Sequence, residues 1–157
     1  MNAGHWLVWG FGATVVLSVL MAGSQRLNLT RMNLPYLLGS MFTPDRDRAR
    51  LLGLLVHLVN GLAFSALYVA AFHARGRVEV WFGALMGLVH AMFVLTVVLP
   101  ALPALHPRMA TAAEGPTDER RLAPPGFLAL HYGPRTPISV ILSHIVFGAI
   151  VGLFYRL

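Results

Sequence analysis

Four uninterrupted apolar stretches dominate the chain. They cover residues 6–23, 51–72, 80–100 and 138–155, and none of them contains Asp, Glu, Lys or Arg. Each is close to the about 20 residues that an α-helix needs to cross about 30 Å of hydrocarbon. This pattern predicts an all-α integral membrane protein with four transmembrane helices, over 6–23, 44–72, 80–100 and 137–156, in one domain covering residues 1–157.

The composition supports the same class of protein. Hydrophobic residues make up 57% of the chain and charged residues 11%, whereas a soluble domain carries about 25% charged residues. The chain has no Cys, which excludes disulfides, Cys-ligated zinc and thiol chemistry. All basic side chains are Arg, and Ala, Gly and Leu are abundant. This usage is typical of a GC-rich bacterial genome and favours the bacterial inner membrane.

The connections between the spans indicate the orientation in the membrane. Residues 24–43 and 101–136 form long loops, whereas 73–79 is short, so the chain reads as two helical hairpins. Nine arginines lie on the long-loop side and three on the opposite side. The positive-inside rule then places the long loops in the cytoplasm and both termini outside. Membrane lipids with anionic headgroups, and not nucleic acid, are the expected partners of these arginines.

Two Thr-Pro pairs predict helix starts. Thr43-Pro44 precedes the second span and Thr136-Pro137 the fourth, and Thr as N-cap followed by Pro is a common helix beginning. The segment 34–39, LPYLLG, is too apolar for a free loop and too short to span. We expect it to lie along the membrane surface or to dip into it.

A histidine-bearing motif occurs twice. Residues 57–68 read HLVNGLAFSALY and residues 144–155 read HIVFGAIVGLFY, both with the pattern H-x3-G-x6-Y. The match predicts a tandem duplication of a two-helix hairpin, with chance similarity between apolar helices as the alternative. At 100° per residue the histidine, glycine and tyrosine of each copy share one face of the helix.

Three histidines are expected to converge inside the membrane. His57 and His144 lie at similar depth on parallel helices, and His90 lies about halfway down the third span. Ionisable groups within a membrane usually face the interior of the bundle. They predict haem b held by His57 and His144, or a transition-metal site with His90, His106 or His131 added, for electron transfer or metal handling. The alternative is that the histidines only form hydrogen bonds between helices.

The glycines near these histidines also have two interpretations. Gly53, Gly61 and Gly148 each lie one turn from a histidine, where a missing side chain admits either a porphyrin or a neighbouring helix. Small residues four apart are a common packing device in lipid. The chain has this spacing at residues 83 and 87 and at residues 148 and 152.

The function predicted from these features is non-catalytic. The spans contain no Asp or Glu to couple ion transport, and Ser139 and Ser143 near His144 have no acidic partner in their helix. We therefore expect an accessory or assembly subunit, whose glycine-rich faces contact other membrane subunits or a second copy of the chain. The alternative function is that of the haem- or metal-binding histidine site.

Overall fold

Four long apolar helices form the body of the molecule. The computed structural model describes residues 2–111 and 115–157, and these residues form helices and no strand. The helices that are long and apolar enough to cross a membrane are α1 (Ala3–Arg26), α3 (Arg46–Arg75), Val80–Leu105 and α6 (Thr136–Phe154). The prediction of an all-helical chain with four spans is confirmed.

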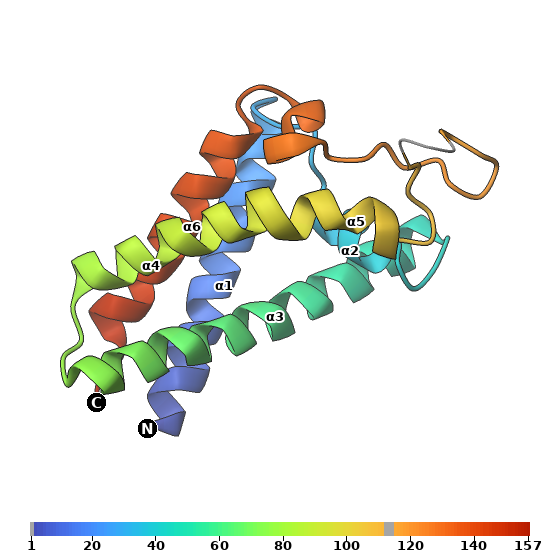
Figure 1. Ribbon diagram of the computed structural model, residues 1–157. Helices are drawn as coiled ribbons and strands as arrows, with labels where there is room; N and C mark the ends of the chain where they lie inside the picture. The colour runs from blue at the N-terminus through green and yellow to red at the C-terminus, as the bar shows by residue number, and fades with distance from the viewer. Residues whose placement is uncertain (1, 112–114) are drawn as a thin grey trace.

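The helices are arranged in two layers (Figure 1). α3 and the Val80–Leu105 span lie in front, and α1 and α6 lie behind and cross them at an angle. α6 packs along α4 and against α1, and α1 packs against α3. Beyond their short connection, the backbones of α3 and α4 make little contact, so side chains bridge them. Both termini lie at the same end of the molecule as this connection.

The third span is not a continuous α-helix. It consists of α4 (Val80–Phe93), a π-helical stretch η1 (Val94–Val98) and α5 (Leu99–Leu105). Pro100 has no N–H to bond the carbonyl four residues earlier, and Pro103 lies inside α5. The widened turns precede these prolines directly. Val94 and Val98 of this stretch and Leu102 of α5 line a cavity in the interior of the molecule.

Both predicted helix starts differ from the observed ones. α3 begins at Arg46 with Asp45 as its N-cap, and the Asp45 carboxylate accepts a hydrogen bond of 2.8 Å from the Arg48 N–H. Asp is at least as good an N-cap as Thr, so the helix starts after Pro44. In α6, Thr136 is the first helical residue and does not act as a cap. Its hydroxyl forms a hydrogen bond of 2.7 Å with the Thr30 hydroxyl.

The apolar segment in the first long loop is a short helix docked on α3. α2 (Leu34–Gly39) has Asn33 as its N-cap, and it packs against the first half of α3. The contact is made by backbone, because a Cβ atom on Gly39 would overlap the Ala49 carbonyl and one on Gly53 would overlap the Pro35 carbonyl. α2 is therefore part of the packed structure.

His106 ties the end of α5 to α2. The imidazole is 1% exposed. Its Nε2–H donates to the Leu37 carbonyl at 3.0 Å, and its Nδ1 accepts from the Arg108 N–H at 3.1 Å. Burial lowers the pKa of His106, which agrees with a neutral ring that uses one nitrogen as donor and the other as acceptor. His106 therefore has a structural role.

Candidate functional site

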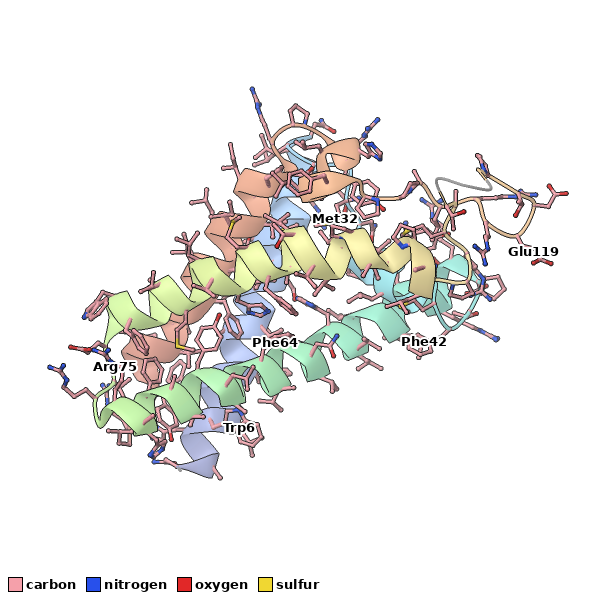
Figure 2. All side chains as sticks on the ribbon, in the orientation of Figure 1. Trp6, Met32, Phe42, Phe64, Arg75 and Glu119 are labelled. Carbon is pink, nitrogen blue, oxygen red and sulfur yellow. The ribbon has the colours of Figure 1, made fainter. Side chains whose placement is uncertain are left out.

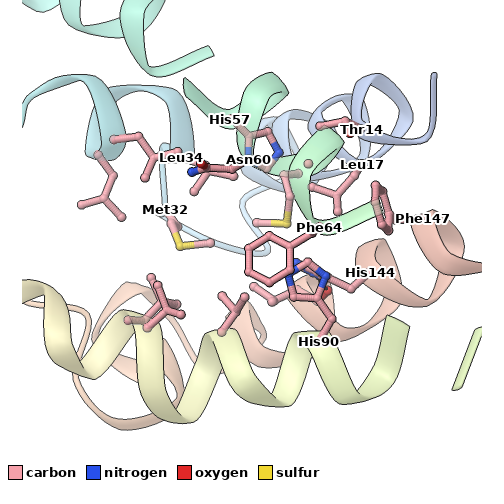
Figure 3. A pocket seen from close by; sticks show the side chains of 18 of the residues that line it. Thr14, Leu17, Met32, Leu34, His57, Asn60, Phe64, His90, His144 and Phe147 are labelled. Carbon is pink, nitrogen blue, oxygen red and sulfur yellow. Dashed lines mark hydrogen bonds between the residues drawn. The ribbon is translucent and has the colours of Figure 1, made fainter. Parts of the chain in front are cut away.

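A cavity of about 120 Å³ lies where the four spans and α2 meet (Figure 3). His57 on α3, His90 on α4 and His144 on α6 all line it. Thr14 and Asn60 are the other polar residues of the lining, and the rest is apolar. The three histidines singled out in the sequence thus face one space, and no Asp or Glu of the described residues lines it.

His90 lies at the centre of a cluster of rings. Its ring is edge-to-face with that of His144, with 4.7 Å between the ring centroids. The Phe64 ring stacks on the His90 ring, with 4.0 Å between the centroids, and the centroid of the Phe147 ring lies 6.2 Å away. Phe64 reaches from α3 into the space between α3 and α4 (Figure 2). Aromatic side chains therefore join two helices whose backbones stay apart.

Hydrogen bonds orient two of the three imidazoles. The Nδ1 atom of His144 lies 2.8 Å from the Val140 carbonyl oxygen. A carbonyl only accepts, so Nδ1 carries the proton and Nε2 of the neutral ring is a free acceptor. The Nδ1 atom of His90 lies 3.2 Å from the Tyr68 hydroxyl. Each ring is thus held by one nitrogen, and its second nitrogen forms no hydrogen bond with the described residues.

The third imidazole has an unpaired nitrogen. The Nε2 atom of His57 is buried and has no hydrogen-bond partner among the described residues. Leaving a buried polar atom unpaired costs about 1–3 kcal/mol. A ligand with a hydrogen-bonding group in this cavity would recover that free energy.

The two other candidate metal ligands lie elsewhere. His131 is exposed, and its Nδ1 is 3.0 Å from the Pro124 carbonyl oxygen. His106 is held between α5 and α2. Neither lines the histidine cavity. Across residues 2–111 and 115–157, no three His, Asp or Glu side chains are grouped as a metal site would require.

Other parts of the protein fill the space beside the glycines near the histidines, so there is no room for a porphyrin. A Cβ atom on Gly61 would overlap the Thr14 side chain, and one on Gly148 would overlap the Gly83 carbonyl. Gly53 is covered by α2. The cavity of about 120 Å³ is also well below the about 300–1,000 Å³ of typical ligand pockets. Haem b held by His57 and His144 does not fit this arrangement.

The paired glycines close the contact between α4 and α6. A Cβ atom on Gly87 would overlap the His144 carbonyl, and one on Gly152 would lie 2.7 Å from the Glu79 carbonyl oxygen. Gly83 and Gly148 face each other in the same way. These glycines are used inside the chain, so they offer no docking face to a partner. The accessory role remains a prediction, but these glycine faces no longer support it.

Several residues of the site are not apparent from the sequence. Tyr68 and Tyr155 of the repeated motif are 2% and 0% exposed, and no sequence signal predicts what their hydroxyl groups contact. The Tyr155 hydroxyl lies 2.8 Å from Nε2 of His73. Met21 and Met32 also line the cavity, and no motif links them to the histidines.

Comparisons with known proteins do not assign the chain to a family. No protein-family model, curated protein or solved structure matches the chain. The cavity therefore carries the functional argument. It offers neutral imidazole nitrogens and aromatic surfaces, a combination suited to binding a small, largely apolar molecule that has one hydrogen-bonding group.

Proposed function

We propose that this chain is a non-catalytic integral membrane protein that binds one small, largely apolar ligand in the histidine cavity. The observation that carries the proposal is that His57, which lines that cavity, has a buried and unpaired Nε2 atom. A hydroxyl group on the ligand would satisfy this nitrogen, because a hydroxyl both donates and accepts. The cavity and its ligand are therefore complementary in polarity.

The volume of the cavity limits the ligand to about one ring. An apolar cavity of about 150 Å³ is known to accept benzene, and this one encloses about 120 Å³. The Phe64, His90 and Phe147 rings around it favour an aromatic ligand, since ring pairs add about 0.5–1.5 kcal/mol to the burial of their area. A phenol with one ring meets both requirements.

We propose binding without catalysis because no histidine of the cavity is paired with a carboxylate among the described residues. Within the described residues, the cavity wall holds no carboxylate to orient or activate a histidine. His144 is hydrogen-bonded to the Val140 carbonyl, and His90 is hydrogen-bonded to the Tyr68 hydroxyl. General acid–base or nucleophilic catalysis needs a positioned partner of that kind.

Titration with para-propylphenol tests the proposal. We expect saturable binding of one molecule per chain in lipid nanodiscs, measured by calorimetry. The His57→Leu variant should bind about tenfold more weakly, because the hydrogen bond to the ring nitrogen is lost. His5→Leu is the matched control, since the His5 Nδ1 is also buried and unpaired but His5 does not line the cavity. Equal affinities of the two variants would contradict a ligand site. So would partitioning of para-propylphenol into the lipid without saturation.

The orientation in the bacterial inner membrane is part of the proposal. The arginine distribution favours an orientation with α2 and the long loops in the cytoplasm. The termini share the other end of the molecule (Figure 1). A reporter fused after Leu157 is therefore expected to read the outside of the membrane. Reporter activity in the cytoplasm would reverse the orientation and leave the cavity proposal intact.

The repeated hairpin is supported by how the two histidine helices pack. The glycine one turn after His57 contacts α1, and the glycine one turn after His144 contacts α4. Each histidine helix therefore uses the same position against the span that precedes it in the chain. This correspondence is what a duplication of one hairpin would produce.

A further inference from the structure

A second hollow, which we call the vestibule, adjoins the histidine cavity at the end where α1 finishes and α3 begins. It encloses about 320 Å³. Arg26, Arg50, Gln25 and Asn33 give it a polar wall. It shares Met21, Met32, Leu34 and His57 with the histidine cavity. His57 therefore lies where a molecule passing between the two hollows would meet it.

The vestibule carries an excess of positive charge. Arg26 forms no hydrogen bond or ion pair with the described residues. Arg50 has a single ion-pair contact, of 3.5 Å to Asp47, and the Asp47 side chain is almost fully solvent-exposed. An exposed pair of this kind contributes little. No Asp or Glu of the described residues lines the vestibule, so its field attracts anions.

The spacing along α3 connects this charge to the cavity. Arg50 and His57 are seven residues apart in one helix, which brings them to the same face about 10 Å apart along the axis. Both line the vestibule. A molecule with an acidic group near Arg50 thus has its apolar end directed toward His57.

We propose that the ligand of the histidine cavity is a short aromatic acid. Its ring occupies the cavity, and its carboxylate lies in the vestibule beside Arg26 and Arg50. This inference rests on the proposed function and adds the chemical class of the ligand. It also explains why the hollow next to an apolar cavity is lined by two arginines, an asparagine and a glutamine.

Two probes of equal length test the role of the charge. Para-hydroxyphenylpropanoate and para-propylphenol have the same phenol ring and the same three-carbon chain, and only the former ends in a carboxylate. In nanodiscs of phosphatidylcholine we expect the acid to bind about tenfold more tightly, the value of one hydrogen bond to a charged group. In the double variant Arg26→Gln, Arg50→Gln this ratio of affinities should fall to about one. Arg46→Gln is the matched control, because Arg46 begins α3 but does not line the vestibule.

The outcomes separate the two proposals. Binding of para-propylphenol without any advantage for the acid overturns the acidic ligand and leaves the cavity function standing. Binding of neither probe overturns both. If phosphatidylglycerol in the nanodiscs abolishes the advantage of the acid, the headgroup of an anionic lipid occupies the vestibule and the free acid is overturned. An advantage that survives phosphatidylglycerol and is lost only in the double arginine variant supports the proposal.

Discussion

The Gly148→Leu variant is expected to lose more than about 3 kcal/mol of its free energy of unfolding, at or above the usual upper end for an overpacked core. A Cβ atom at this position would overlap the Gly83 carbonyl. Backbone atoms have no rotamers to relieve the overlap, so α6 has to move away from α4. Because His144 and His90 lie on these two helices, their edge-to-face contact should be lost with it. Unfolding in mixed micelles, followed by circular dichroism, measures the loss.

A glycine on α1 provides the control for this prediction. A Cβ atom on Gly12 would have no neighbour within 4 Å, so Gly12→Leu adds the same side chain without a clash. We expect this variant to unfold close to the wild type. Equal stability of Gly12→Leu and Gly148→Leu would show that α4 and α6 do not depend on the glycine contact.

The Gly53→Leu variant should release α2 from α3. A side chain here would overlap the Pro35 carbonyl and lie within 2.7 Å of the Gly39 nitrogen. Leu34, Leu37 and Leu38 of α2 line the histidine cavity, so its wall should open. We expect a loss of stability of about 1–3 kcal/mol and at least a tenfold loss of affinity for para-propylphenol. Calorimetry and proteolysis within residues 27–45 measure the two effects.

Gly23→Leu is the control for this second prediction, because no atom lies within 4 Å of a Cβ atom there. Retained protease resistance and retained affinity in Gly53→Leu would show that α2 is not needed to close the cavity. Loss of affinity in both variants would point instead to a general effect of leucine on the bundle.

The spans and the meeting of the three histidines were accessible from the sequence. A run of about 20 apolar residues is a strong signal, because the hydrocarbon core tolerates little else. The convergence of His57, His90 and His144 followed from helical geometry alone, since depth and facing depend only on residue spacing. Both predictions depend only on residues within a single helix, so contacts between distant segments do not change them.

The contacts between distant segments were not accessible in this way. The docking of α2 depends on Gly39 meeting Gly53, and the hydroxyl of Thr136 is bound by Thr30 instead of capping its helix. The glycines beside the histidines were equally compatible with a porphyrin and with a neighbouring helix. The positions of Thr14, Gly83 and α2 decide between them. Such choices depend on shape complementarity between elements, which residue spacing along one helix does not encode.

The length of α3 makes the cavity sensitive to the surrounding lipid. Its 30 residues extend about 45 Å, against about 30 Å of hydrocarbon, so the helix has to tilt or to project from the membrane. α3 is joined to α4 at one end and bridged to it by the Phe64, Tyr68 and His90 rings. Shorter acyl chains increase the tilt of a long helix, and the cavity lies inside the angle that this tilt changes. For the ligand proposed above, we expect affinity to depend on bilayer thickness where α3 tilts instead of projecting its charged first turn from the membrane. Titrations in lipids of graded chain length would measure this dependence.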